Sequence, residues 1–366
     1  MAFNRHFIIY FFVVMNLFTS LDAEVSEYDK KRIKLDLKKK RYDRLGIFLR
    51  QGVGHSSSDL SKVEKIAKNS GSQKLRDAIH ATKKFKHTGG NKLLSTGSFL
   101  QTALFIETGL KKHVAHKQYY LRKNKTGLSR TVEYDPSKKR AFIVLDGIKS
   151  AYLGKGAKKT AYKAIRYNKT KPEIVARAEQ SADIGRELSI AKRLRGARGV
   201  LGTDGVGRHR AHGKKYTTIY SKLYSSGNLK KAIVEKVKFS PNEKIRIGLK
   251  ILQGLASMHK SGVVHRDLAA QNIFLNIPKG KVGKRKIDAV IADFGWSHYV
   301  GQLYYKKAQA NIRNTAPEGV LRNHIKRSDY YATDVYAIGL ILYRLIYGYN
   351  ASWKTAAHMT HSKRHL

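Results

Sequence analysis

Two short acidic motifs, separated by a pair of apolar runs, constrain this chain more than any other feature. The first is the run His-Arg-Asp-Leu-Ala-Ala-Gln-Asn at 265–272, and the second is Asp-Phe-Gly at 293–295. Between them, apolar runs at 273–275 and 289–292 flank a polar turn rich in lysine and glycine. Apolar runs separated by turn residues predict a β-hairpin. We expect the two motifs to lie on loops at opposite ends of this antiparallel pair.

In this order, and with Ala-Pro-Glu following at 316–318, the motifs resemble those of the eukaryotic-type protein kinases. The resemblance implies an α+β, two-lobed fold with a β-rich N-lobe and a helical C-lobe. It also implies transfer of the ATP γ-phosphate to a protein hydroxyl, which requires charge neutralisation and alignment more than covalent chemistry. Asp267 would orient the hydroxyl and accept its proton. Asn272 and Asp293 would supply oxygen ligands to Mg2+, as suits a hard cation.

Upstream, the run Gly-Lys-Gly-Ala-Lys-Lys-Thr at 154–160 resembles a glycine-rich nucleotide loop with strands on both sides. Glycine lets backbone amides approach phosphates without obstruction by a side chain. Gly154 and Gly156 match the first two glycines of the family pattern, whereas Lys159 stands at the third. An ordinary β-turn is the simpler interpretation of two glycines taken alone.

The phosphate-binding lysine of the family is missing from its usual strand, because Val-Ala-Arg-Ala at 175–178 places Ala178 there. Together with Lys159 this resembles the with-no-lysine kinases, which carry the lysine at the third glycine position. A lysine acts as a point charge and can reach the phosphates from either strand. Lys163 is the alternative, and loss of the lysine altogether is the third possibility.

Other parts of the kinase pattern can be placed by the same resemblance. A helix at 180–194 carries Glu187 as the partner of the lysine, with Asp183 as a rival. Arg266 would bind a phosphate on the activation segment through its guanidinium group. The candidate phosphate acceptors of that segment are Ser297, Tyr299, Tyr304, Tyr305 and Thr315.

A further helix, ending near residue 346, carries Asp334 and Gly339 and resembles the one whose aspartate holds the catalytic loop. The sequence departs from the family at Ala269 and Gln271, where kinases place a basic residue after the catalytic aspartate. The choice between Ser/Thr and Tyr as acceptor therefore stays open.

The coarse pattern predicts several more elements. Helices are expected at 59–68, 73–85 and 242–260, and a hairpin at 130–134 and 140–144. A strand is expected at 217–224. The segment 199–213, rich in glycine and arginine, is predicted to be a loop. The helix at 242–260 is predicted to be buried on the strength of apolar residues at helical spacing: Ile245, Ile247, Leu249, Leu252, Leu255 and Met258.

The composition adds a strong positive charge. The 366 residues include 73 Lys and Arg against 26 Asp and Glu, which gives a net charge of +47. Such a charge predicts attraction to nucleic acid, anionic lipid or acidic proteins. The chain shows no helix-turn-helix, zinc-finger or RNA-binding signature. Cysteine is absent, which excludes disulfides and cysteine metal sites.

The apolar run from Phe7 to Phe18 is shorter than the ~20 residues that a membrane span requires. Its length and terminal position favour a secretory signal peptide at residues 1–23, and hence a secreted protein. The alternatives are a buried element and an uncleaved membrane anchor with the kinase in the cytoplasm, because Lys30, Lys31, Arg32 and Lys34 follow the run closely.

The expected organisation is therefore a signal or anchor (1–23), a basic region (24–138), a kinase-like domain (139–347) and a tail (348–366). The N-lobe would cover about 139–224 and a partial C-lobe about 225–347. Because further C-lobe helices have no room before residue 366, we expect a truncated and unstable C-lobe. Two function classes remain: an ATP- and Mg2+-dependent protein kinase, and a pseudokinase that binds nucleotide or protein. Binding to nucleic acid or an anionic surface through the basic N-terminal region could accompany either. The oligomeric state is left open.

Overall fold

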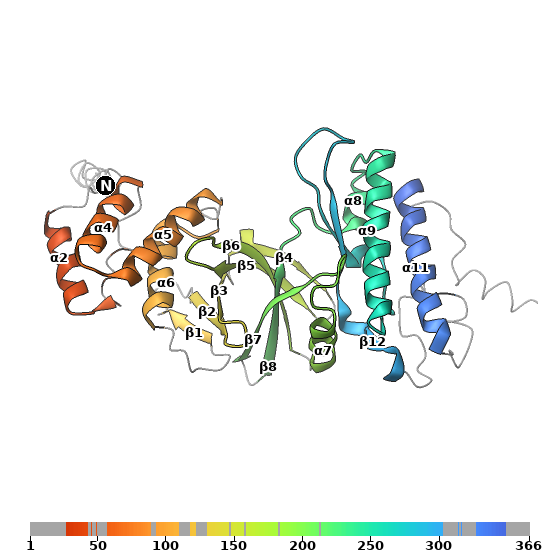
Figure 1. Cartoon of the computed structure of the whole chain (residues 1–366), viewed down its shortest axis with the longest axis horizontal. Helices are drawn as coiled ribbons and strands as arrows, with labels where there is room; N and C mark the ends of the chain where they lie inside the picture. The colour runs from red at the N-terminus through yellow and green to blue at the C-terminus, as the bar shows by residue number, and fades with distance from the viewer. Residues whose placement is uncertain are drawn as a thin grey trace, which may run out of the picture. The chain divides into compact units, whose positions relative to one another are not determined.

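A computed structural model of the chain describes residues 27–42, 45, 49, 57–88, 93–109, 118–121, 130–145, 148–156, 159–181, 184–211, 214–302, 314, 316 and 327–348. The chain forms two compact units (Figure 1). The first comprises Met1–Gln180 and Gly205–Thr218, and the second comprises Ser181–Asp204 and Ile219–Leu366. The predicted signal segment lies outside the described residues. Within the described part of the chain, no helix is long and apolar enough to cross a membrane.

The first unit begins with four helices: α2 (Glu27–Lys38), α4 (Ser57–Asn69), α5 (Gln73–His87) and α6 (Thr96–Gly109). The helices predicted at 59–68 and 73–85 are thus confirmed as α4 and α5. Ser72 caps the N-terminus of α5, since its side chain accepts a hydrogen bond from the amide of Leu75.

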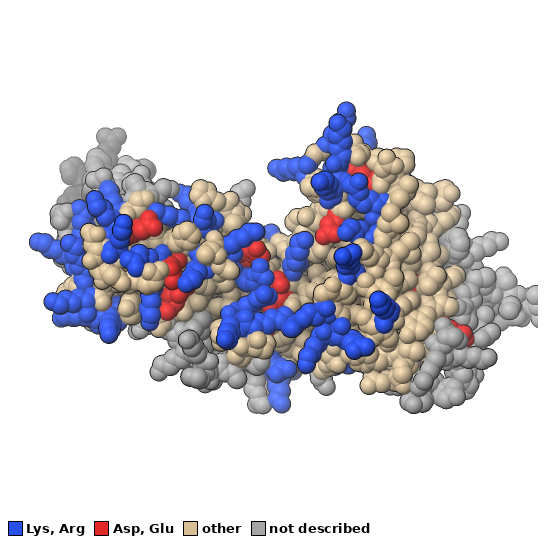
Figure 2. Space-filling model, viewed as in Figure 1, with Lys and Arg blue, Asp and Glu red and all other residues tan. Residues whose placement is uncertain are grey.

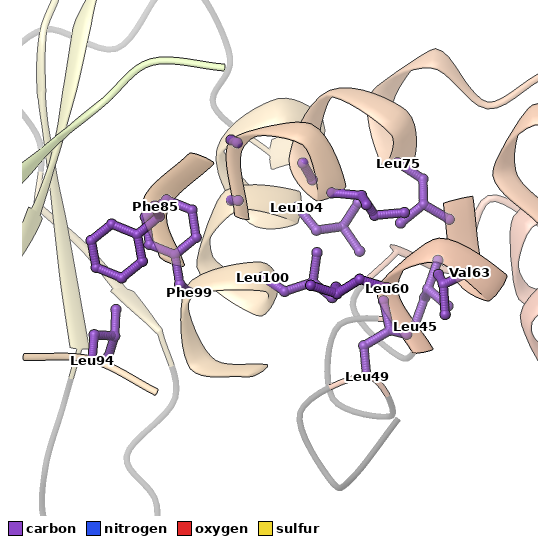
Figure 3. Packing of buried hydrophobic residues seen from close by; sticks show 14 of the residues in the cluster. Leu45, Leu49, Leu60, Val63, Leu75, Phe85, Leu94, Phe99, Leu100 and Leu104 are labelled. Atoms are coloured by element: carbon purple, nitrogen blue, oxygen red, sulfur yellow. The ribbon is translucent and has the colours of Figure 1, made fainter. Parts of the chain in front are cut away.

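The helices of this unit pack on one face of a β-sheet through a shared apolar core (Figure 3). The rings of Phe85 and Phe99 stack with centroids 4.1 Å apart, between α5 and α6. The same cluster includes Ile143 and Ile165, which are paired directly across two neighbouring strands. The basic N-terminal region therefore shares its core with the sheet.

The sheet contains eight strands. Their bounds are β1 (Gln118–Leu121), β2 (Arg130–Asp135), β3 (Arg140–Val144), β4 (Tyr152–Lys155), β5 (Thr160–Tyr167), β6 (Glu173–Gln180), β7 (Thr203–Ala211) and β8 (Lys214–Lys222). The order is β1-β2-β3-β5-β6-β8-β7, and β4 pairs with β5 off this path. The hairpin predicted at 130–144 is confirmed as β2–β3. The predicted domain boundary at 138/139 falls inside its turn.

Buried polar groups connect β2 with strands far along the sheet order. The carboxylate of Asp135 accepts from the amide of Val206 at 2.9 Å, and that of Glu133 accepts from the hydroxyl of Thr218 at 2.7 Å. Glu133 also pairs with Arg177 of β6 at 3.3 Å, and neither side chain is more than 2% exposed. These contacts curl the sheet so that β2 approaches β6, β7 and β8.

The prediction of a loop at 199–213 was wrong, because β7 occupies most of that segment. Its glycines are required by close packing. A Cβ on Gly205 would lie 2.5 Å from the Phe142 ring, and one on Gly207 would lie 2.0 Å from Glu133 Oε2. The glycine content that suggested a loop is therefore what lets the curled sheet close.

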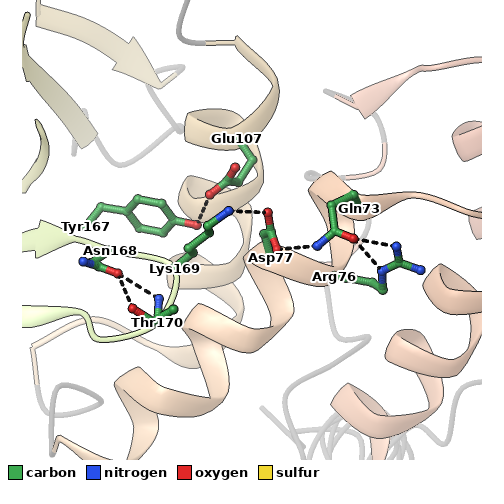
Figure 4. A network of polar contacts seen from close by, with 8 residues as sticks. All are labelled: Gln73, Arg76, Asp77, Glu107, Tyr167, Asn168, Lys169 and Thr170. Carbon is green, nitrogen blue, oxygen red and sulfur yellow. Dashed lines mark hydrogen bonds and ion pairs between the residues drawn. The ribbon is translucent and has the colours of Figure 1, made fainter. Parts of the chain in front are cut away.

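A polar network joins the β5–β6 turn to the helices (Figure 4). The hydroxyl of Tyr167 donates to Glu107 at 2.8 Å, and Lys169 pairs with Asp77 at 3.2 Å. Burial raises the pKa of Glu107 above its ordinary value. The helices are thus fixed to the sheet by both apolar and polar contacts.

The second unit is built around two long helices, α9 (Pro241–Lys260) and α11 (Arg327–Tyr347). The shorter elements are α7 (Gly185–Arg193), α8 (Leu229–Val234), β9 (Val263–Val264), β10 (Ile273–Asn276), β11 (Asp288–Ile291) and β12 (His298–Tyr299). Three-residue 3-10 turns occur at η3 (Ala270–Asn272), η4 (Phe294–Trp296) and η5 (Val300–Gln302). A sheet-rich unit and a helical unit together make the predicted α+β, two-lobed fold.

Helix α9 was predicted correctly in position, but only three of its six predicted buried residues are buried: Ile247, Leu255 and Met258. The exposed side chains are Ile245, Leu249 and Leu252, at 60%, 62% and 42%. The buried side of the helix also includes Ile251, which was not predicted. Helix α7 also begins later than predicted, because Gln180 ends strand β6 and the helix starts only at Gly185.

Candidate active site

The hairpin β10–β11 brings the two acidic motifs together. Ile273 pairs with Ile291 at the open end of the hairpin, while Asn276 pairs with Asp288 near the turn. The prediction that the motifs lie at opposite ends was wrong, because a hairpin returns the chain to the end at which it started. The amide of Ala292 donates to the carbonyl of Asn272 at 2.9 Å and joins the two loops.

The loop of residues 265–272, called the catalytic loop below, is held in place by Asp334 of α11, whose side chain is 1% exposed. Its two carboxylate oxygens accept from the amides of His265 and Arg266, at 2.8 and 3.0 Å. His259 of α9 lies 3.0 Å from the same carboxylate. The expectation that Asp334 holds the loop backbone is confirmed, and His259 is a partner that no sequence signal indicated.

Asp267 and Asn272 lie side by side in this loop. The amide nitrogen of Asn272 donates to the backbone carbonyl of Asp267 at 2.7 Å and to its carboxylate at 3.2 Å. These bonds fix the Asp267 carboxylate and leave the amide oxygen of Asn272 as an acceptor. Both loops contain a non-glycine residue with positive φ, Arg266 at 68° and Asp293 at 67°. Such backbone is typical of functional sites, where the surrounding contacts impose it.

The donor set fits a cation shared with nucleotide phosphates. Among the described residues, no three His, Cys, Asp or Glu side chains gather into a self-contained metal site. Asn272 and Asp293 supply oxygen atoms from adjacent loops, which suits Mg2+ because this ion takes few protein ligands and completes its shell with phosphate and water. The predicted metal ligands are therefore brought to the same end of the hairpin.

Two arginines meet at His298, three residues beyond the Asp-Phe-Gly motif. The guanidinium of Arg266 lies 3.0 Å from Nδ1 of His298, and that of Arg186 lies 2.9 Å from Nε2. Arg186 also donates to the carbonyl of Gly295 at 3.0 Å. Burial lowers the pKa of the Arg266 guanidinium. Sequence reasoning missed Arg186 and His298, since neither belongs to a motif.

The candidate phosphate acceptors near this cluster differ in accessibility. The side chain of Ser297 is fully buried, whereas Tyr299 is half-buried and lies 3.0 Å from the hydroxyl of Ser189. Tyr304, Tyr305 and Thr315 lie outside the described residues, as does the rival carboxylate Asp183.

Glu187 occupies the first turn of α7 and is 8% exposed. Helix α7 packs against η4, which contains the phenylalanine and glycine of the second motif. Glu187 thus belongs to the same unit as the catalytic loop. Lys159 belongs to the first unit, and its ion pair with Glu187 stays a prediction.

In the first unit, the glycine-rich loop joins β4 to β5 as predicted. The amide of Gly156 donates to the carbonyl of Lys159 at 2.8 Å, which closes the turn. Gly154 has a φ of 151°, a conformation that side-chain-bearing residues rarely adopt. The predicted role of these glycines in holding phosphates stays a prediction.

The register of β5 and β6 places the candidate lysines relative to Ala178. Ala161 is paired with Ala178, so these two residues share a face of the sheet, whereas Lys159 lies one residue before β5 begins. Lys163 shares the face, opposite Ala176. The amino group of Lys163 donates to the carbonyl of Ser150 at 3.1 Å, just before β4.

Comparison with known proteins identifies the family. A sequence model of the protein kinase domain matches residues 148–365, which is more than half of the chain. The chain belongs to the protein kinase family. The catalytic loop, the Asp-Phe-Gly motif and Asp334 all lie within the matched region.

Individual kinases match over shorter stretches. A probable serine/threonine-protein kinase WNK9 of Oryza sativa subsp. japonica is 26% identical over 231 residues, covering 59% of this chain and 49% of that protein. A probable myosin light chain kinase of Dictyostelium discoideum is 31% identical over 129 residues, 35% of this chain and 39% of that protein. A calcium-dependent protein kinase 4 of Plasmodium berghei is 33% identical over 138 residues, which cover 36% of this chain and 24% of that protein. The chain thus matches less than half the length of each of these relatives.

Proposed function

We propose that the chain transfers the γ-phosphate of ATP to a hydroxyl group of a protein substrate. The observation that carries the proposal is the ordered catalytic loop, in which Asp334 fixes the backbone and Asn272 fixes Asp267. Asp267 would accept a hydrogen bond from the substrate hydroxyl and align its oxygen with the phosphate. Mg2+, held by Asn272 and Asp293, would neutralise phosphate charge.

Lys159 would bind the phosphates in place of the lysine that Ala178 replaces. Its position in the glycine turn, one residue before β5, supports this assignment, because the Gly156 amide bonds the carbonyl of Lys159 there. Glu187 would orient Lys159. A phosphate on the activation segment would bind between Arg266 and Arg186, where guanidinium groups already converge on His298.

Two substitutions test the proposal. Asp267→Ala should reduce phosphotransfer to the background rate and leave ATP affinity nearly unchanged, because Asp267 positions the acceptor and not the nucleotide. Asp293→Ala should weaken ATP binding in the presence of Mg2+ and have little effect without it. Transfer is measured with Ser-, Thr- and Tyr-containing peptides, and affinity by titration calorimetry. Equal transfer by wild type and Asp267→Ala would remove Asp267 from the mechanism.

The second candidate function is that of a nucleotide- or protein-binding pseudokinase, which Ala178 and Ala269 favour because each replaces a basic residue of the family. ATP binding without measurable transfer to any of the three peptides would support it. Binding of an anionic surface by helices α2, α4 and α5 is compatible with both functions. Acidic side chains of these helices are engaged internally, in the pairs Asp36–Arg41, Glu64–Lys83 and Asp77–Lys169.

A further inference from the structure

The hairpin β10–β11, which follows the catalytic loop, is called the catalytic hairpin below. Its turn projects from the second unit as a lysine-rich tip. Residues 277–287 join β10 to β11, and the exposed lysines within them are Lys279, Lys281, Lys284 and Lys286. The amide of Lys284 donates to the carbonyl of Lys281 at 3.0 Å, which makes a tight turn. Val282, 44% exposed, stands at its apex. Gly283 follows with a φ of 94°, as a turn of this kind requires.

A second loop, between α8 and α9, lies against the tip and adds Lys236 and Lys238, which are also exposed. The guanidinium of Arg285 donates to the carbonyl of Lys238 at 2.6 Å. A Cβ on Gly283 would lie 3.7 Å from the hydroxyl oxygen of Ser240. The six lysines of these two touching loops are called the lysine surface below. Figure 2 shows Lys and Arg side chains projecting where Figure 1 draws the loop beside α8 and α9.

A buried ion pair holds the lysine surface in place. Arg285 donates to both carboxylate oxygens of Glu243, at 2.9 and 2.8 Å. Glu243 is 1% exposed and also completes the capping box of α9 with Ser240. Arg285 further lies over the ring of Phe239, 5.7 Å from its centroid. A surface anchored in this way loses little conformational freedom when it binds a partner.

The positive charge of the lysine surface is not neutralised by neighbouring carboxylates. Residues 229–243 and 276–288 contain three acidic side chains, and each is engaged. Glu243 binds Arg285, Glu235 pairs with Lys231 at 3.7 Å, and Asp288 pairs with Lys222 at 3.6 Å. The lysine surface therefore presents a concentrated charge to a partner in solution.

We propose that the lysine surface docks an acidic segment of the protein substrate. The proposal rests on the proposed function, and it names a substrate class: proteins that carry an acidic stretch separated from the phosphorylated residue, because the tip and the catalytic motifs lie at opposite ends of the hairpin. Charge complementarity selects the partner, and the exposed Val282 offers contact to an apolar side chain within the acidic stretch. A tip at the turn of this hairpin would tether the substrate to the unit that carries Asp267.

The chemistry favours a peptide over nucleic acid. Single strands are bound by basic grooves in which bases stack on aromatic side chains. The two loops expose no aromatic side chain, since Phe239 is partly buried and covered by Arg285.

The test measures binding of a fluorescein-labelled peptide in which six glutamates alternate with valines, by fluorescence anisotropy on the full chain. The docking variant combines Lys279→Glu, Lys281→Glu, Lys284→Glu and Lys286→Glu. The matched control combines Lys192→Glu, Lys214→Glu, Lys215→Glu and Lys260→Glu, which changes the net charge equally from exposed positions on α7, β8 and α9. Arg285 and Glu243 stay in place, and equal melting temperatures would show that both variants fold.

We expect the docking variant to lose about tenfold or more in affinity, from the summed effect of four exposed charges, and the control to stay within about twofold. Equal losses in both variants would overturn the proposal in favour of non-specific attraction to the charged chain. A six-nucleotide DNA strand that binds the wild type more tightly than the peptide, and loses affinity only in the docking variant, would overturn it in favour of nucleic acid.

Docking and catalysis can fail separately. Phosphorylation of a short peptide without acidic residues should be unchanged in the docking variant, while phosphorylation of the same peptide extended by the glutamate–valine stretch should fall with the affinity. If the wild type transfers no phosphate, the proposed function fails, and the anisotropy measurement still decides whether the lysine surface binds an acidic segment.

Discussion

The two candidate phosphate-binding lysines differ in where they lie relative to the glycine turn and strand β5. Lys163 and Lys159 lie four residues apart, so the sequence pattern alone cannot separate them. The contact between the amino group of Lys163 and the carbonyl of Ser150 gives that lysine a structural position at the base of β4. Lys159 lies next to the glycine turn and is the better candidate for the phosphates.

Lys159→Met should therefore reduce kcat/KM by about 100-fold or more, since a cation on the transferring phosphate is typically worth a few kcal/mol. Lys163→Met serves as the control and should reduce it far less. Steady-state kinetics at saturating Mg2+ would check both. A large loss in Lys163→Met with full activity in Lys159→Met would transfer the role to Lys163.

At the scale of elements, helix α9 shows that apolar residues at helical spacing do not by themselves identify the buried side of a helix. Its apolar residues surround much of the helix, and only the side packed on β11 and α11 is covered. The N-terminus of α9 is more specific, because Glu243 both caps the helix and binds Arg285 of the catalytic hairpin. The hydrogen bonds from Arg285 lower the pKa of Glu243 to about 2.

This pKa predicts acid sensitivity of the second unit. A carboxylate whose pKa is depressed in the folded state stabilises the fold above its unfolded pKa, and that stability is lost as the pH falls towards the folded value. The free energy of unfolding should thus fall by about 3 kcal/mol between about pH 5 and pH 2 through Glu243. Tryptophan fluorescence reports on this unit, since Trp296 and Trp353 both belong to it.

Glu243→Gln is the matching variant for this measurement. It should be less stable than the wild type at pH 7, because Arg285 loses its charged partner, and its stability should depend less on pH over the same range. The same pH dependence in both proteins would show that other carboxylates cause the acid unfolding.

At the scale of the whole molecule, the basic N-terminal region and the nucleotide strands fold as one unit. Glu133 belongs to the region before the matched kinase domain, whereas Arg177 belongs to the strand that contains Ala178. The two form a buried ion pair, so the charge of Glu133 is compensated by a strand of the matched domain, while Arg177 also pairs with Glu179 of its own strand. Strand β3 also shares an edge of β5 with the glycine-loop strand β4.

Glu133→Ala should lower the free energy of unfolding of the first unit by about 3 kcal/mol. This cost is at the lower end of the range for breaking a buried ion pair, because Glu179 still binds Arg177 in the variant. Glu173→Ala is the control in the same sheet, where the ion pair with Arg166 is partly exposed, and it should cost under about 1 kcal/mol. Hydrogen exchange of β6 amides would measure both. Equal costs would mean that the buried pair does not connect the two segments.

The sequence alone determined the parts of this protein that local chemistry specifies. The acidic motifs, the glycine turn, the position of α9 and the β2–β3 hairpin follow from residue types at short spacing, and the kinase family follows from the order of the motifs. Asp334 could be assigned its role because its place in a motif implied which backbone it would hold.

Only the tertiary structure decided which faces are buried and which distant residues meet. The glycines of β7 predicted a loop from the sequence. In the structure they belong to a strand, because the side chains of Phe142 and Glu133 occupy the space where a Cβ would lie. Arg186 and His298 carry no motif and meet only because α7 packs against the start of the activation segment. Ion pairs such as Glu133–Arg177 and Glu243–Arg285 join residues more than 40 positions apart. Such partners depend on how elements pack in space, which short-range residue patterns do not encode.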